Sequence, residues 1–90
     1  MPFIVPNKTQ ALIELRMTGV RFTDTTVYIA LNDNREVGLP LSLRDLRWLA
    51  NATPPQRANW VIGPGGRSVL WNDLDDGIEI EHLLKDQALA

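Results

Sequence analysis

The chain has 90 residues, of which 44% are hydrophobic and 22% are charged, and its formal net charge at pH 7 is -2. This length allows one small hydrophobic core, and the composition is that of a globular protein. The absence of cysteine excludes a disulfide framework, thiolate metal ligands and a cysteine nucleophile. The slight excess of acidic residues argues against general nucleic-acid binding, which requires clustered lysine and arginine.

The N-terminal stretch MPFIVPNKTQ does not have the pattern of a targeting sequence. Pro2 and Pro6 interrupt its short apolar start, and no basic region precedes that start. No segment of the chain reaches the roughly 18 apolar residues of a membrane-spanning helix. Residues 1–12 show no periodicity, so we expect a loose N-terminal arm followed by a single domain over 13–90. We expect a cytoplasmic protein without a membrane partner.

Alternating apolar and polar residues predict three strands in the first half of the chain. Ile13, Leu15, Val20 and Phe22 alternate with charged neighbours, and Gly19 marks a bend or bulge among them. The β-branched segment TTVYIALN (25–32) and the alternating segment REVGLPL (35–41) follow, and the turn-forming sequence Asn-Asp-Asn lies between their apolar residues. The pattern predicts an antiparallel meander.

Two short helices are expected after the meander. Ser42 can cap the first, with Asp45 as a weak capping-box acid, and the leucines that follow form an apolar stripe. Thr53 followed by Pro54 predicts the start of the second helix, because proline at the first helical position loses no hydrogen bond.

The last third of the chain predicts a hairpin and a helix. Residues 60–71 form two apolar segments around Pro-Gly-Gly, whose glycines supply the positive φ of a tight turn. Ile80, Leu83 and Leu84 have helical spacing, which would direct Glu81, His82 and Lys85 outward. The predicted fold is α+β, a small single domain with one antiparallel sheet of about five strands. Its order is three strands, two helices, two strands and a helix. The expected core residues are Val27, Ile29, Leu31, Val37, Leu39, Leu46, Leu49, Trp60, Val69, Trp71, Ile80, Leu83 and Leu84.

Negative charge is concentrated near the C-terminus. Residues 1–71 hold eight basic and five acidic residues, a net charge of +3, whereas residues 72–90 hold one basic and six acidic residues, a net charge of -5. The stretch WNDLDDGIEIEHLL over 71–84 has some likeness to a calcium-binding loop. Counting from Asn72 places Gly77 at the required sixth position but leucines at the third and twelfth. We therefore predict absent or weak metal binding and interpret the stretch as a strand-to-helix connector whose acids favour a helix N-terminus.

The sequence contains no obvious catalytic residues. Carboxylates that act as acid and base need a desolvated member, and this acidic run is expected to be exposed to water. His82 lacks a second histidine nearby, so a surface or packing role is expected rather than a role as a metal ligand or base. The segment GPGGRS over 63–68 lacks the lysine of a phosphate-binding loop and is expected to be a turn. We assign no catalytic residue, no metal ligand and no cofactor.

Two candidate interaction surfaces remain, although each can also be interpreted as ordinary solvated charge. The tryptophans can act as interface anchors, but core packing is the expected role. The acidic candidate surface comprises Asp73, Asp75, Asp76, Glu79 and Glu81. The alternative basic surface comprises Arg44, Arg47, Trp48 and Arg57.

Several motifs of the chain follow a known family pattern: LPL (39–41), WLANATPPQRANW (48–60), Trp71 and LDDGIEIEHLL (74–84), together with the hairpin over 20–37. On these residues the chain, from Leu39 onward, resembles the bacterial family known as domain of unknown function 2442. Arg47 stands where relatives often carry proline. The resemblance implies a small α+β fold and no known enzymatic activity. Relatives are often encoded beside a second small protein, which suggests a toxin and antitoxin pair, and some carry a C-terminal helix-turn-helix that this sequence is not expected to contain.

We therefore expect a non-enzymatic interaction module, antitoxin-like, that binds a small basic protein partner. One alternative is a DNA-associated regulatory domain that uses the arginines of the basic surface, although nucleic acid is not the expected partner. A small enzyme of unknown class is the second alternative. Self-association into a homo-oligomer is compatible with the sequence.

Overall fold

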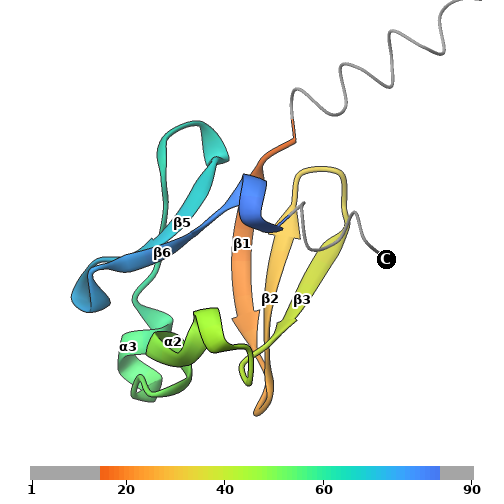
Figure 1. The fold of residues 1–90 in the computed structure, drawn as a ribbon. Helices are drawn as coiled ribbons and strands as arrows, with labels where there is room; N and C mark the ends of the chain where they lie inside the picture. The colour runs from red at the N-terminus through yellow and green to blue at the C-terminus, as the bar shows by residue number, and fades with distance from the viewer. Residues whose placement is uncertain (1–14, 84–90) are drawn as a thin grey trace, which may run out of the picture.

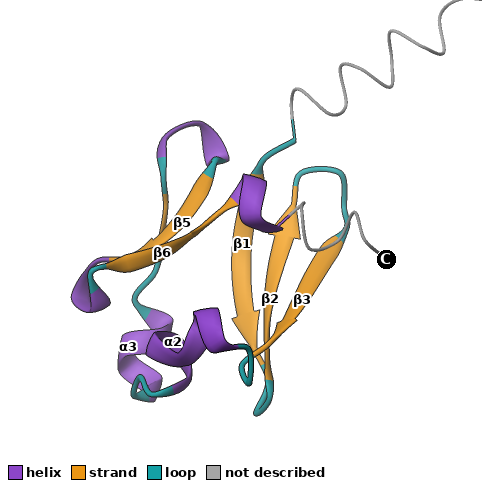
Figure 2. Cartoon of the chain, viewed as in Figure 1, coloured by secondary structure: helices purple, strands orange, loops and turns teal. Residues whose placement is uncertain are grey.

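The computed structural model describes residues 15–83, which form two three-stranded antiparallel sheets joined by short helices (Figure 1). The first sheet has the order β1-β2-β3 and the second the order β4-β5-β6. The strands are β1 (Met17–Phe22), β2 (Thr26–Leu31), β3 (Glu36–Pro40), β4 (Val61–Ile62), β5 (Ser68–Trp71) and β6 (Asp76–Glu79). The helices between the sheets are the 3₁₀ turn η1 (Arg44–Leu46), α2 (Arg47–Ala50) and α3 (Pro54–Ala58) (Figure 2).

The first sheet follows the predicted meander. Val27 pairs with Leu39 and Ile29 pairs with Val37, so the alternating apolar residues share one buried face. The register of β1 against β2 shifts between Met17 and Gly19, as the glycine predicted. The predicted tight turn between β2 and β3 is confirmed, because Asn34 adopts a φ of 72° that asparagine tolerates.

The helical connection differs from the prediction at its first end. Ser42 does not cap a helix, because η1 begins at Arg44 after Leu43 and has no side-chain cap. The chain leaves β3 through backbone turns instead: the Leu43 N–H donates to the Pro40 carbonyl at 3.1 Å, and the Leu46 N–H donates to the Leu43 carbonyl at 3.0 Å. These turns replace the helix start that Ser42 was expected to cap.

The second helix begins where its sequence predicted. The Gln56 N–H donates to the Thr53 hydroxyl at 3.3 Å, and the Thr53 N–H donates to the Gln56 side-chain oxygen at 2.9 Å. The result is a capping box that satisfies two of the N–H groups that a helix start leaves unpaired.

The prediction of one sheet with about five strands is wrong, since the structure has two sheets and a strand that the sequence did not suggest. Residues 72–74 form the 3₁₀ turn η3 (Asn72–Leu74), and Asp75 then adopts a left-handed conformation with φ of 54°. This reversal directs β6 back along β5, where Trp71 pairs with Asp76 and Val69 pairs with Ile78. The interpretation of this segment as a strand-to-helix connector is therefore also wrong.

The predicted turn over 63–68 is confirmed. The 3₁₀ turn η2 (Pro64–Gly66) links β4 to β5, and Gly65 and Gly66 have φ values of 66° and 70°. Gly66 also lies against Arg16, because a Cβ at Gly66 would come within 2.6 Å of the Arg16 Cβ. A side chain at Gly66 would separate this turn from the start of the first sheet.

Both sheets bury their apolar faces in the same cluster. Of the predicted core residues that the structure describes, Trp60 is half-buried and all the others are buried, while Leu84 lies outside the described residues. Ile13, Lys85 and the N-terminal arm also lie outside them. The buried cluster comprises Leu15, Met17, Val27, Ile29, Leu31, Val37, Leu39, Leu41, Leu46, Leu49, Val69, Trp71, Ile78, Ile80 and Leu83.

A helical turn over 80–83 follows β6. Ile80 and Leu83 are fully buried, whereas Glu81 and His82 are exposed, as their helical spacing predicted. In the part of the chain that the structure describes, no helix is long and apolar enough to cross a membrane.

Candidate interaction groove

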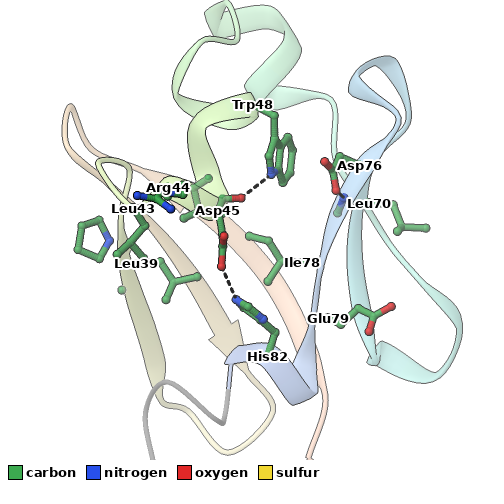
Figure 3. Close-up of a pocket in the computed structure, with 14 residues that line it drawn as sticks. Leu39, Leu43, Arg44, Asp45, Trp48, Leu70, Asp76, Ile78, Glu79 and His82 are labelled. Atoms are coloured by element: carbon green, nitrogen blue, oxygen red, sulfur yellow. Dashed lines mark hydrogen bonds and ion pairs between the residues drawn. The ribbon is translucent and has the colours of Figure 1, made fainter. Parts of the chain in front are cut away.

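An open groove lies between the two sheets, bounded by β3 and η1 on one side and by β6 and the helical turn over 80–83 on the other (Figure 3). Its volume is about 900 Å³. The apolar side chains that line it are Leu39, Pro40, Leu43, Leu46, Trp48, Leu70 and Ile78. The charged and titratable residues along it are Arg44, Asp45, Asp76, Glu79 and His82. The groove therefore combines an apolar lining with more acidic than basic groups.

Trp48 connects the groove to the core. Its indole Nε1 donates to the Asp45 carbonyl at 2.8 Å (Figure 3), and its ring meets the buried Trp71 edge-on, with ring centroids 5.5 Å apart. A half-buried tryptophan held at both its polar and its apolar part has little freedom to reorient. This wall of the groove is therefore preformed.

Leu43 supplies the most exposed apolar surface of the groove, at 40% exposure. Among the described residues, Val61 at 43% is the other exposed large hydrophobic residue, and it lies on β4 away from the groove. A single exposed apolar residue is ordinary at a protein surface. Leu43, however, lines the groove together with other apolar side chains, so its exposure adds to the apolar surface of the groove.

Asp45 and His82 face each other across the groove (Figure 3), with 3.6 Å between the carboxylate Oδ2 and the imidazole Nε2. Their side chains are 71% and 52% exposed, so neither sits in the desolvated setting that tunes a general acid or base. Protonation of His82 would make this contact an ion pair. The pair links η1 to the helical turn over 80–83.

The acidic residues predicted to form one surface divide into three groups. Asp76 and Glu79 line the groove. Asp73 lies at η3, where its Oδ2 accepts a 2.8 Å hydrogen bond from the Asn59 side chain, and Asp75 occupies the left-handed position that follows. Glu81 accepts a 2.6 Å hydrogen bond from Arg67, which lowers the pKa of that carboxyl.

The basic residues of the alternative surface also have separate positions. Arg44 lines the groove beside Trp48, and Arg47 is exposed outside it. Arg57 instead donates from Nε to the Leu49 carbonyl at 3.1 Å and from Nη2 to the Ala50 carbonyl at 2.8 Å. Its guanidinium therefore satisfies carbonyls at the C-terminal end of α2, which limits its use as a contact for phosphate.

The three tryptophans divide in the same way. Trp71 is fully buried, which confirms core packing for this residue, whereas Trp48 and Trp60 are half-buried. Only Trp48 lines the groove. Trp48 therefore combines a packing role with a surface that a partner could reach.

The chemistry available in the groove suits binding. Neither serine of the chain lines it, and its residues include no other hydroxyl or thiol nucleophile. Within residues 15–83, no group of three or more histidine, aspartate or glutamate side chains is arranged to hold a metal ion. An apolar surface with exposed charges around it is typical of a protein interface.

Several groove residues were not singled out as partner contacts by the sequence. Asp45 was interpreted as a capping acid and His82 as a surface residue, while Leu43 and Leu70 belonged to an expected helix and an expected strand. No local pattern could have joined them, because Asp45 and His82 are far apart in the chain. The packing of the two sheets brings them together.

The fold and the groove define the molecule as a small α+β domain with an open groove between its two sheets. The family described as "Protein of unknown function (DUF2442)" matches residues 17–87, and the chain belongs to this family. The predicted resemblance is thereby confirmed. A solution NMR structure of an uncharacterised protein from Chromobacterium violaceum has a similar fold, with a TM-score of 0.68 at 20% identity over 93% of this chain and 77% of that one. No curated protein matches the chain.

Proposed function

We propose that this chain is a cytoplasmic, non-enzymatic interaction module whose groove binds a small basic protein, in the manner of an antitoxin that neutralises a toxin. The observation that carries the proposal is the arrangement of acidic groups around an apolar surface. Asp45, Asp76 and Glu79 stand along the groove against the single arginine Arg44.

The acidic groups of the groove are available for a partner. Glu79 forms no ion pair within the described residues, and the Asp76 carboxylate accepts a hydrogen bond from the neighbouring Gly77 N–H rather than from a cation. The Asp45 side chain is 71% exposed, and its carboxylate lies 3.6 Å from the His82 imidazole. Acidic groups in this state attract basic partners over several ångströms and accelerate association.

The apolar lining supplies the short-range part of the interaction. Leu43 and Trp48 present surface that loses contact with water when a partner binds, and such burial is the main favourable term in protein association. The charges then favour a basic partner over an acidic one. An open groove without a buried acid or base supports binding over catalysis.

The test is affinity capture from the native host with matched charge variants. The groove variant carries Asp45→Lys and Glu79→Lys. The control carries Asp24→Lys and Asp73→Lys, which change the net charge by the same amount at exposed positions outside the groove. The wild type and the control should capture the same small basic protein, and added salt should weaken the capture. The groove variant should capture little of it.

A growth assay tests the antitoxin-like part of the proposal. Expression of the captured protein alone should slow growth, and co-expression of the wild-type chain, but not of the groove variant, should restore it. Equal capture by the groove variant and the control, or capture of an acidic partner, would reject the proposed function.

A further inference from the structure

The side of β6 that does not pair with β5 borders the groove. β6 is the last strand of the order β4-β5-β6, and Gly77, Ile78 and Glu79 all line the groove. A strand at the edge of a sheet presents backbone groups that can pair with an added strand. An added strand can pair only with those groups of β6 that have no partner within its own sheet.

The hydrogen-bond register of the second sheet identifies them. The Ile80 N–H donates to the Arg67 carbonyl across the sheet at 2.8 Å. In an antiparallel ladder every second residue bonds to a given neighbour, so Ile78 and Asp76 face β5 while Gly77 and Glu79 face away from it. Within the described strands, the Gly77 carbonyl and the Glu79 N–H therefore have no ladder partner.

The remaining edge donor is satisfied by a side chain. The Gly77 N–H donates to the Asp76 Oδ1 at 2.8 Å. This bond agrees with the assignment of Gly77 to the free edge, because a residue facing β5 would donate to that strand. Strand edges that stay unpaired in a monomer commonly carry charged side chains that protect them.

The other edge that borders the groove is less suited to strand addition. Pro40 at the end of β3 has no N–H, and its carbonyl already accepts from the Leu43 N–H. Of the acidic groove residues, Asp76 and Glu79 belong to β6 and none belongs to β3. Both the hydrogen-bonding groups and the charges favour β6.

We infer, on the basis of the proposed function, that the groove recognises an extended basic segment of the partner, which adds as an antiparallel strand to the free edge of β6. Side chains alternate between the faces of a sheet, so the partner residue opposite Glu79 shares its outer face and the residue opposite Ile78 points into the groove. The segment that fits alternates apolar residues, directed into the groove, with lysine or arginine, directed outward.

A peptide of about seven residues that alternates valine with lysine is the probe, since this is the length of an ordinary strand. It should bind the full chain with a saturable shift of groove resonances in NMR spectra, and it should slow hydrogen exchange of the Glu79 amide. A peptide with glutamate in place of lysine should not bind. A lysine-containing peptide of the same charge designed to form a helix should bind at least about tenfold more weakly.

Backbone methylation distinguishes strand addition from binding by charge alone. In the antiparallel arrangement the lysine amides face β6 and the valine amides face away. N-methylation of the lysines should therefore abolish binding, whereas N-methylation of the valines should leave binding largely intact. Both methylated peptides keep the same charge and composition.

Two protein variants give a matched test of the position. Leu43→Lys places a positive charge on the apolar wall of the groove, and Val61→Lys does the same at a similarly exposed residue on β4. Leu43→Lys should weaken binding of the valine and lysine peptide about tenfold or more, while Val61→Lys should not. Thermal melts of both variants check that the fold is retained.

The outcomes separate this inference from the function on which it rests. Equal binding of the two methylated peptides, or preferred binding of the helical one, overturns strand addition but leaves a groove that binds basic segments. Equal binding of the lysine and glutamate peptides contradicts both. Absence of saturable binding by the valine and lysine peptide overturns strand addition. The capture experiment then tests the proposed function separately.

Discussion

The indole Nε1 of Trp71 donates a 2.9 Å hydrogen bond to the backbone carbonyl of Arg57. This bond joins the end of α3 to the fully buried centre of the second sheet. The Trp71 ring also meets Phe22 of the first sheet edge-on, with centroids 6.4 Å apart. A single side chain therefore contacts both sheets and positions the helical connection between them.

Trp71→Phe is predicted to reduce the free energy of unfolding by about 2 to 3 kcal/mol, because it leaves a cavity and a carbonyl without its donor. Chemical denaturation followed by circular dichroism measures the change. Trp60→Phe, at a half-buried position, is the control and should cost less. A loss for Trp71→Phe no greater than for the control would contradict the central position of Trp71.

Arg57→Ala is predicted to destabilise the fold by about 1.5 to 3 kcal/mol, since charged donors to the Leu49 and Ala50 carbonyls are lost. Arg47→Ala is the matched control, because Arg47 is exposed and forms no ion pair within the described residues. Its effect should stay within about 0.5 kcal/mol. Denaturant unfolding of the two variants side by side provides the measurement. Equal stability of the Arg57→Ala and Arg47→Ala variants would contradict this structural role and would make Arg57 a candidate surface contact again.

Leu83→Ala is predicted to cost about 2 to 5 kcal/mol, because Leu83 is fully buried in the shared core. The comparison is Leu43→Ala, which truncates an exposed leucine and should change the melting temperature little. An unchanged melting temperature for Leu83→Ala would contradict the packing of the helical turn over 80–83 in the core.

The pH dependence of stability should include a contribution from Glu36. Arg21 donates from Nε and Nη2 to the two Glu36 carboxylate oxygens at 2.8 and 2.9 Å, and these hydrogen bonds lower the Glu36 pKa below its usual 4.5. A carboxyl with a lowered pKa in the folded state stabilises the fold above the unfolded-state pKa. This contribution is lost as pH falls through the lowered value.

Glu36→Gln should therefore melt slightly below the wild type at neutral pH, and the difference should shrink as the pH falls below 4.5. The effect is small because both side chains are exposed. Melts monitored by circular dichroism across this range, with and without added salt, provide the measurement. A difference that grows as pH falls would contradict the assigned pKa shift.

The acidic stretch over 71–84 should bind divalent cations weakly or not at all, because its ligand spacing does not match a calcium loop. Calorimetric titration with calcium, magnesium and zinc is the measurement. A dissociation constant below about 10 μM that Asp75→Asn abolishes would contradict this prediction, since sensor sites of the calcium-loop type bind in that range.

The sequence by itself determined the local structure wherever a single segment carries the whole signal. The alternating residues of β2 and β3, the Asn34 turn, the Gly65 and Gly66 turn and the Thr53 capping box depend on neighbours a few residues apart. Their physical causes, which are side-chain alternation, tolerance of positive φ and local capping, can be read along the chain. The family could likewise be recognised from short motifs.

Only the tertiary structure decided the rest. Ile78 and Ile80 alternate as in a strand, but Ile80 and Leu83 also have helical spacing, and pairing with β5 determines that the strand ends at Glu79. Strand pairing between segments divides the strands into two sheets, because backbone hydrogen bonding depends on which edges meet. The groove exists for the same reason: Asp45, Glu79 and His82 become neighbours only when both sheets bury their apolar faces in one core.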